Sequence, residues 1–326
     1  DMLKKYLLYG IFGCLLVLVG CNKDEEEITS PSYADRNWFV IPDKPGEFNQ
    51  LVYKIYAETG VPIFVSDTLG EEYYAKDAEG NPILRTEKFN LSYVMFGSTE
   101  DDRQGSTHYI VQSSDTPAML KAAELIRNRV LPHVPKVGEA LPKCYFLVDS
   151  LNENANLILP WSQLPCRIEN KPLYVAMKGV VVGQLCDILQ MTDEEIDLWC
   201  GRVIASKLVS WMLNGNMNMD LVKWYAITNE GTRDAYYNKA YASTASEYNF
   251  DVYKDMGMLG WYVDIPDVRA TYTQEDDLIE YVARVYAYRG REQEFLDRYA
   301  DYDKVLRKFQ MMQGFVNTFE EWWDLK

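Results

Sequence analysis

The chain changes character at Thr192, and this change constrains its fold more than any other feature of the sequence. Before Thr192, short apolar runs of strand length alternate with two helical patterns, whereas helical patterns dominate afterwards. Thr192 and Glu195 form a capping box, in which each side chain satisfies a free amide of the other residue, and this predicts that a long helix begins here. Since a chain with a mainly helical second half does not form an all-β sandwich, we expect an α+β fold.

The first half is predicted to form a small mixed sheet backed by helices. Apolar residues recur at helical spacing between Gly46 and Gly60, so we expect a helix that ends at Gly60. A second helix is expected to begin after Asp115 and to stop at Pro132. Apolar runs of strand length predict the strands of the sheet at 61–65, 91–96, 107–111, 144–148, 173–177 and 180–182.

The second half is predicted to hold three long helices. The first spans 193–213, where apolar residues form a continuous stripe. The second begins at Thr273, which is followed by acids typical of a first helical turn, and the third spans 291–316. Between them, residues 225–250 are rich in Tyr, Asn and Ser, and we expect them to form a surface loop.

The first residues carry the pattern of a secretory signal. Lys4 and Lys5 precede an apolar run at 6–19, which is shorter than the roughly 20 residues of a membrane-spanning helix. The run ends in Leu-Val-Gly-Cys, which resembles the lipobox of bacterial lipoproteins, where the signal peptidase cuts before a cysteine that carries a diacylglyceryl group. The resemblance implies a signal peptide at 1–20, a lipidated Cys21, an acidic flexible linker at 21–34 and a single domain at 35–326.

The acidic run at 22–27 suggests where the anchored protein resides. It resembles the export signal that carries lipoproteins of the Bacteroidota type to the outer face of the outer membrane. Alternatively, the run only keeps the linker solvated and extended through repulsion of like charges. Both interpretations predict a lipid-anchored protein, and the resemblance to the export signal implies that the protein lies in the outer membrane and is exposed at the cell surface.

The charge balance excludes one class of partner. The chain has 49 acidic and 33 basic residues and a formal net charge of −16. Because a surface of this sign repels phosphate backbones, we expect no nucleic acid partner. Attachment to the membrane must then come from the lipid rather than from a basic face.

Histidine and cysteine are too sparse for the commonest metal sites. His108 and His133 are the only histidines. Four cysteines remain after the signal peptide and the lipidation site, and none is part of a C-x-x-C pair. In an envelope compartment they are either buried free thiols or form one disulfide: Cys144, Cys166, Cys186 and Cys200.

The order of the segments resembles a family of surface lipoproteins described as zinc-binding metallopeptidases or substrate import-associated zinc metallohydrolases. The resemblance covers residues 45–326 and implies a zincin-like fold, a place beside a TonB-dependent transporter, and a peptide or glycan ligand. In active members, the helix that corresponds to 193–213 carries an HExxH motif. The resemblance rests on the lipobox and on four pieces of sequence, at 52–63, 193–213, 260–263 and 275–280.

The corresponding helix of this chain lacks the zinc motif. HExxH places two imidazoles one helical turn apart to bind Zn²⁺, and its glutamate polarises the metal-bound water. Here Ala205 and Val209 occupy the histidine positions and Ser206 that of the glutamate. We therefore expect no zinc, no other cofactor and no catalytic residue. We also expect this helix to pack against 275–288, with Ala205 and Val209 facing the cleft where zinc would lie.

Three acids match the stretch that would help to complete the family's metal site, namely Asp276, Asp277 and Glu280. Without histidines, a carboxylate site would favour Ca²⁺ or Mg²⁺ over zinc. The sequence favours a simpler interpretation, in which these acids bind no metal. Acids in the first turn of a helix complement its dipole and face water.

No other catalytic pattern stands out, but aromatic residues are abundant. The sequence contains no G-x-S-x-G elbow, phosphate-binding loop or dinucleotide fingerprint. Its 24 Tyr and 8 Trp suit a surface that stacks a sugar or holds a peptide. We therefore expect a non-catalytic binding or accessory component of nutrient import. The alternatives are a hydrolase that uses the acidic site and a glycan-binding module. The candidate ligand contacts are Tyr236, Tyr237, Tyr241, Tyr248, Trp322 and Trp323.

Overall fold

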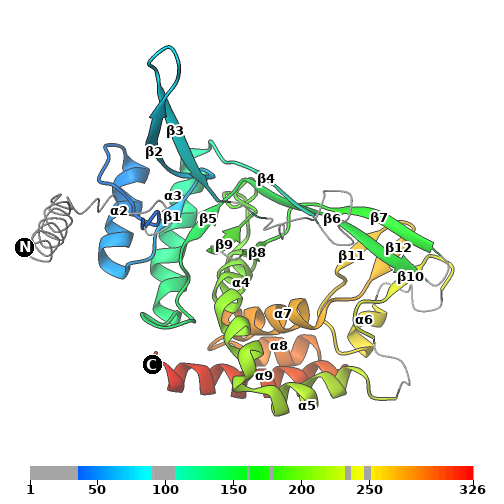
Figure 1. Ribbon diagram of the computed structural model, residues 1–326. Helices are drawn as coiled ribbons and strands as arrows, with labels where there is room; N and C mark the ends of the chain where they lie inside the picture. The colour runs from blue at the N-terminus through cyan, green and yellow to red at the C-terminus, as the bar shows by residue number, and fades with distance from the viewer. Residues whose placement is uncertain are drawn as a thin grey trace, which may run out of the picture. The chain divides into compact units, whose positions relative to one another are not determined.

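The computed structural model describes residues 36–89, 91, 107–159, 162–176, 179–231, 236–245 and 251–325. The chain divides into two compact units, Asp1–Trp38 and Phe39–Lys326. In the described part of the first unit, the guanidinium of Arg36 lies 4.6 Å from the centre of the Trp38 ring. The signal peptide, Cys21 and the acidic linker lie outside the described residues. The second unit is a mixed α+β structure, as expected (Figure 1).

A four-stranded sheet forms the centre of the first half of this unit. Its strand order is β1 (Ile63–Phe64), β5 (Tyr145–Leu147), β9 (Gly179–Val182) and β8 (Leu173–Ala176). The first three strands are parallel, and β8 runs antiparallel to β9. Parallel strands are covered on both faces and therefore have nearly continuous apolar sequences, which is why the pattern at 144–148 predicted β5 correctly.

The two faces of this sheet pack against different layers. Tyr145, Leu147 and Val182 pack with apolar residues of α2 (Glu47–Thr59) and α3 (Thr116–Leu125). The alternate residues, such as Phe146 and Val181, join a smaller cluster on the other face. Both helices were expected: Gly60 ends α2 in a left-handed conformation, and the Asp115 side chain caps α3. The chain after α3 continues through two short helical turns, Ile126–Val130 and Leu131–His133.

Of the five strands of the first half that lie outside the central sheet, only one was predicted. The strand β4 (Thr107–Val111) was expected, and it pairs with β6 (Ser150–Leu159), which pairs with β7 (Ser162–Ile168). Because polar residues occupy alternate positions of β6 and β7, neither strand shows the apolar run on which the prediction depended. The exposed hairpin of β2 (Thr68–Lys76) and β3 (Pro82–Lys88) was missed for the same reason (Figure 1). Of the strand predicted at 91–96, only Leu91 lies within the described residues.

The second half is built around two helices that cross in close contact, α4 (Asp193–Trp211) and α7 (Gln274–Ala287). Both were expected, and Thr192 and Thr273 cap them as the sequence indicates. Gly201 explains how closely they approach, because a Cβ atom at this position would collide with the carbonyl oxygen of Ala283. The packing of the helix at 196–211 against 275–288 is therefore confirmed.

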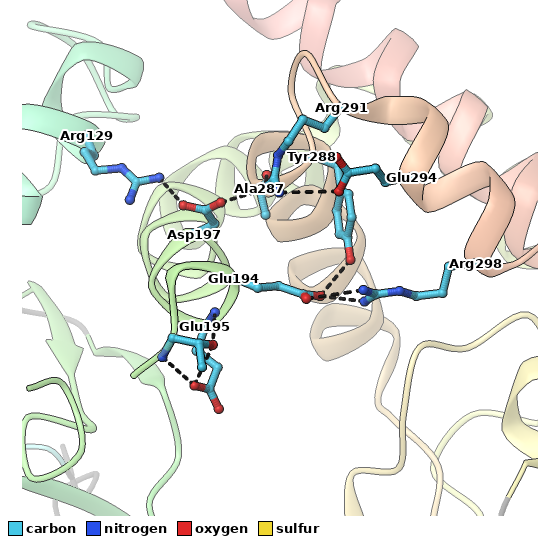
Figure 2. A network of polar contacts seen from close by, with 10 residues as sticks. Arg129, Glu194, Glu195, Asp197, Ala287, Tyr288, Arg291, Glu294 and Arg298 are labelled. Carbon is cyan, nitrogen blue, oxygen red and sulfur yellow. Dashed lines mark hydrogen bonds and ion pairs between the residues drawn. The ribbon is translucent and has the colours of Figure 1, made fainter. Parts of the chain in front are cut away.

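Ion pairs connect the start of α4 to the helices on either side (Figure 2). The Asp197 carboxylate accepts hydrogen bonds from Arg129, at 2.5 Å, and from Arg291, at 2.7 Å. Glu194 pairs with Arg298 of α8 (Glu292–Arg298) at 2.5 Å, and chiefly this guanidinium lowers the pKa of Glu194 to about 2. These pairs hold α4 between the end of the α3 segment and the C-terminal helices.

Two predictions about the second half are wrong. The segment 225–250 is not one surface loop, because α5 (Asn218–Thr228) includes its first residues and β10 (Ala240–Ala242) pairs with β12 (Val268–Ala270). The helix predicted at 291–316 is two helices, α8 and α9 (Asp303–Trp322), with a turn between them. That turn brings the rings of Phe295 and Phe309 to 3.9 Å, whereas residues this far apart in one helix would be separated by about 21 Å.

Three elements complete the described structure. A short helix, α6 (Val252–Asp255), precedes β11 (Val263–Ile265), which pairs with β12. A helical turn at Met212–Asn216 connects α4 to α5. None of the helices in the described ranges combines the length and apolar character needed to cross a membrane.

Candidate functional site

The positions that correspond to the zinc motif lie in the hydrophobic core. Ala205 and Val209 are both 0% exposed and belong to the main apolar cluster, together with side chains of α7 and α9. Ser206 is also buried, and its hydroxyl donates a hydrogen bond to the Val203 carbonyl at 2.7 Å. The prediction that Ala205 and Val209 face a cleft is therefore wrong, because apolar packing fills the space beneath them.

Asp277, the second of the three predicted acids, is fully buried in an ion pair with Lys308 of α9. The Lys308 ammonium lies 2.5 Å from the Asp277 carboxylate, which also accepts a hydrogen bond from Tyr237 at 2.7 Å. Burial raises the pKa of Asp277 and lowers that of Lys308, and the opposite charges offset this only in part. Tyr237, a predicted ligand contact, is 8% exposed and is thus a structural partner of Asp277.

Lys308 has a complete set of partners. Its ammonium donates to the Thr228 hydroxyl at 2.9 Å and to the Gly257 carbonyl at 2.8 Å. It also lies over the ring of Trp224, 3.9 Å from the ring centre, and over the ring of Tyr281, at 4.6 Å. Cations are attracted to the faces of aromatic rings, so these contacts add to the hydrogen bonds. The Asp277 cluster is therefore closed to solvent and serves the fold.

Glu280 is held by two arginines. It accepts hydrogen bonds from Arg202 of α4 through Nε, at 2.7 Å, and through Nη2, at 3.0 Å, and it also pairs with Arg284. Burial alone would raise the pKa of Glu280, but the charges of Arg202 and Arg284 outweigh it and lower the pKa to about 2. The expectation that these acids face water is therefore wrong for Asp277 and Glu280.

Asp276 differs from both other acids, because it forms no ion pair within the described part of the chain. Its carboxylate accepts a hydrogen bond from the Thr273 hydroxyl at 2.6 Å, and its backbone amide donates to the same hydroxyl at 3.0 Å. Burial raises the pKa of Asp276, and the charge of Lys171 offsets this only in part. The three acids thus do not converge, and the described residues include no group of three or more His, Cys, Asp or Glu placed to hold a metal ion.

Asp276 lines a cavity of about 220 Å³ beside the crossing of α4 and α7, which we call the α4–α7 cavity. Its walls come from α4, α7, the chain between β7 and β8, and the segments that flank β11 and β12. Besides Asp276 and Glu280, the side chains that carry its chemistry are Lys171, Arg202, Trp261, Tyr262 and Tyr272. The cavity therefore combines aromatic rings with charges of both signs.

A second buried acid lies behind the cavity wall. Glu153 of β6 pairs with Lys171 and accepts a hydrogen bond from the Tyr262 hydroxyl at 2.7 Å. The His108 imidazole lies 3.4 Å from the same carboxylate and stacks on Tyr174 at 3.8 Å. Burial would raise the pKa of Glu153, but its neighbours His108, Lys171 and Tyr262 together hold that pKa well below its usual range. Lys171 is thus fixed in position by its own counter-ion.

The remaining predicted residues lie elsewhere. His133 lies 3.6 Å from Glu320 of α9, remote in sequence from His108. Cys144 and Cys200 are buried, and none of the domain's four cysteines forms a disulfide with another described residue. Tyr241 is half-buried in β10, and Trp322 is 67% exposed at the end of α9. Trp323 packs against Gly138, and Tyr248 lies outside the described residues.

Sequence reasoning found Asp276 and Glu280 but missed most of the cavity. Arg202 could have been found, because it lies on the face of α4 that carries the contact with α7. Trp261 and Tyr262 were noticed only as part of the segment at 260–263, without a role. Nothing in the sequence marked Lys171, whose importance arises from contacts with residues far along the chain. No family model, no curated protein and no solved structure matches this chain.

Proposed function

We propose that this chain is a lipid-anchored protein of the outer membrane surface with a zincin-like fold, which serves nutrient import as a non-catalytic binding component. The proposal depends on what occupies the positions of the family's metal site on helices α4 and α7. Ala205 and Val209, at the positions of the zinc ligands, pack in the apolar core. Asp277 forms an ion pair with Lys308, and Glu280 forms one with Arg202. The helices thus act as a scaffold in place of a metal site.

The α4–α7 cavity supports a binding role. Small-molecule sites are concave and combine apolar or aromatic walls with a few fixed polar groups, and this cavity has both. Its volume suits a ligand of the size of one sugar unit or the end of a peptide. The resemblance of the sequence to import-associated lipoproteins suggests a TonB-dependent transporter as partner, with the peptide or glycan as the nutrient.

Measurements of metal content and of hydrolytic activity test the prediction that the protein is not catalytic. We expect protein purified without chelator to contain less than stoichiometric zinc, and to leave peptide and glycan mixtures uncleaved while it binds one of them in calorimetry. Stoichiometric zinc with chelator-sensitive hydrolysis would overturn the proposal. Hydrolysis that depends on Ca²⁺ or Mg²⁺ and disappears in Asp276→Asn would instead support the alternative, a hydrolase with a carboxylate site.

The anchor is tested in cells by fractionation. Cys21→Ala should move the protein from the membrane to the soluble fraction, because the lipidated thiol is lost. Cys14→Ala is the matched control, since this cysteine lies within the predicted signal peptide and should leave the partition unchanged. If Cys21→Ala remains in the membrane, the lipid anchor is refuted. Protease treatment of intact cells then separates surface display from an inward orientation.

A further inference from the structure

The charges around the α4–α7 cavity do not balance, and this imbalance indicates the kind of group that the cavity binds. Each cation in its wall has an internal counter-ion: Lys171 pairs with Glu153, and Arg202 pairs with Glu280. Asp276 is the acid in the wall that has no ion pair with any described residue. The cavity therefore presents one carboxylate whose charge the fold does not compensate.

The surroundings of Asp276 increase the need for a counter-ion. Glu275, the preceding residue of α7, is exposed and also forms no ion pair with any described residue, and partial loss of hydration together with the charge of Asp276 raises its pKa. Because burying an ionised carboxylate without a partner is unfavourable, a cation that enters the cavity gains an interaction that the protein does not supply. An anion would instead meet Asp276 and Glu280, while Lys171 and Arg202 are already engaged.

The rings of the cavity favour the same kind of ligand. Trp261, Tyr262 and Tyr272 all line it. The faces of Trp and Tyr rings attract ammonium groups, and the effect is larger where water is excluded. Tyr262 already contacts one ammonium, since Lys171 lies 5.0 Å from its ring centre and donates a hydrogen bond to its hydroxyl at 3.2 Å. The Tyr272 hydroxyl makes no hydrogen bond to any described residue, so it can accept one from a ligand.

We propose that the α4–α7 cavity binds the primary ammonium group of its ligand, with Asp276 as the counter-ion and the rings of Trp261 and Tyr272 beside it. This inference rests on the proposed binding function and specifies its ligand. Two nutrient classes carry such a group, peptides at their N-terminus and amino sugars. In both classes, the N–H groups of the ammonium can donate hydrogen bonds to a carboxylate and to a phenol hydroxyl.

Paired probes that differ only in this charge test the proposal by calorimetry. The pairs are the dipeptide Ala-Ala with N-acetyl-Ala-Ala, and glucosamine with N-acetylglucosamine. At about pH 7 an α-amino group with a pKa of about 7.7–8.0 is mostly charged. We expect at least one charged probe to bind, and its acetylated partner to bind at least about tenfold more weakly, because a charge-assisted hydrogen bond is lost. The pair that responds identifies the nutrient class.

Substitutions place the binding site. Asp276→Asn should weaken the charged probe at least about tenfold, whereas the exposed Asp301→Asn should leave binding unchanged. The amide side chain of the Asp276→Asn variant retains an oxygen that can accept from Thr273, so an unchanged urea midpoint will show that the fold persists. Tyr272→Phe removes only the hydroxyl and should weaken binding a few-fold.

Three outcomes would overturn the inference: no charged probe binds, acetylation makes no difference, or Asp276→Asn binds as the wild type does. If a neutral glycan binds instead, and Asp276→Asn does not affect it, the ammonium site is refuted while the proposed binding function stands. If no peptide or glycan of any kind binds, the proposed function itself fails.

Discussion

Asp276 and Asp277 are adjacent in the sequence but occupy opposite environments. Consecutive residues of a helix point about 100° apart. The Asp277 carboxylate of α7 therefore faces the core, whereas the Asp276 carboxylate faces the α4–α7 cavity. Asp277 is 0% exposed and is bound by Lys308 and Tyr237. Asp276 has only the hydroxyl of its own helix cap. The same residue type therefore lies with its own cation in a network closed to solvent at one position, although Oδ1 of Asp277 has no hydrogen-bond partner among the described residues, and in an incomplete network without a cation at the next.

This difference separates charges that serve the fold from charges that are available to a ligand. The Asp277 cluster draws its partners from α5, α9 and the chain between them, and its cation, Lys308, comes from within the fold. Glu280 is intermediate, since Arg202 and Arg284 complete its charge at the edge of the cavity. Of the three acids, only Asp276 depends on a cation that the described residues do not provide.

The largest effect is expected when the closed network is broken. Lys308→Met leaves Asp277 buried without its cation, and we expect the free energy of unfolding to fall by about 3–5 kcal/mol, measured by urea denaturation. Lys304→Met is the matched control one turn earlier on α9, where the ammonium binds the carbonyls of Thr228 and Glu230 near the surface. It should cost about 1.5 kcal/mol or less.

The double variant Asp277→Asn with Lys308→Met sharpens this test. Because it removes both charges, we expect it to recover most of the stability lost in Lys308→Met. A single variant that loses less than about 1 kcal/mol, or a double variant no more stable than the single one, would show that the pair is not the essential feature of this cluster.

A smaller loss is expected at Glu280, with a distinct dependence on pH. Glu280→Gln should lower the stability at neutral pH by about 2–3 kcal/mol, because two half-buried arginines lose their counter-ion. The pKa of Glu280 is lowered in the folded state from 4.5 to about 2. Its contribution is therefore present above about pH 4.5 and is lost as the pH falls towards 2. Urea midpoints measured over this range should fall less steeply for Glu280→Gln than for the wild type.

The control for this prediction is Glu194→Gln. The pKa of Glu194 is also lowered to about 2, but its side chain is 42% exposed, so solvent screens its ion pair with Arg298. We expect a loss of at most about 1 kcal/mol. If the free energy of unfolding falls equally in the two variants, the greater burial of Glu280 does not make its ion pairs more stabilising than that of Glu194.

The comparison also shows how far the sequence could predict this molecule. Local signals were sufficient to predict α2, α3, α4 and α7, because helix caps and apolar stripes depend only on residues that are close together in the sequence. They failed for β6 and β7, whose alternate residues are polar, and at the turn between α8 and α9, where the contact of Phe295 with Phe309 decides the geometry.

The candidate site was less predictable for a related reason. The sequence placed the acids at 276, 277 and 280 in the first turns of a helix, where acids commonly face water. Their actual environments depend on Lys308, Arg202 and Lys171, which are brought to α7 only by the tertiary packing. A pattern within one helix cannot reveal such partners, so the closed and incomplete networks were indistinguishable before the fold was known.

The cap that holds Asp276 should contribute less than either buried ion pair. Thr273→Ala removes the hydroxyl that accepts from the Asp276 amide and donates to its carboxylate, and we expect a loss of about 1 kcal/mol in urea denaturation. Thr273→Ser keeps the hydroxyl and should restore most of this loss. A similar loss in both variants would mean that the methyl group, rather than the cap, is responsible.

The smallest effect on stability is expected at Asp276 itself. Its pKa is raised in the folded state by burial, so ionisation of Asp276 lowers the stability as the pH rises through that pKa. Asp276→Asn cannot ionise, and its free energy of unfolding at neutral pH should equal or exceed that of the wild type, with a difference within about 0.5 kcal/mol. In a pH series of urea denaturation, the wild type should lose stability relative to Asp276→Asn as the pH rises from acidic to neutral, opposite in direction to the effect at Glu280. A loss above about 1 kcal/mol in Asp276→Asn would indicate an internal partner for this carboxylate. If the stability is unchanged while ammonium binding is lost, the charge at Asp276 is kept for a ligand and contributes nothing to the fold.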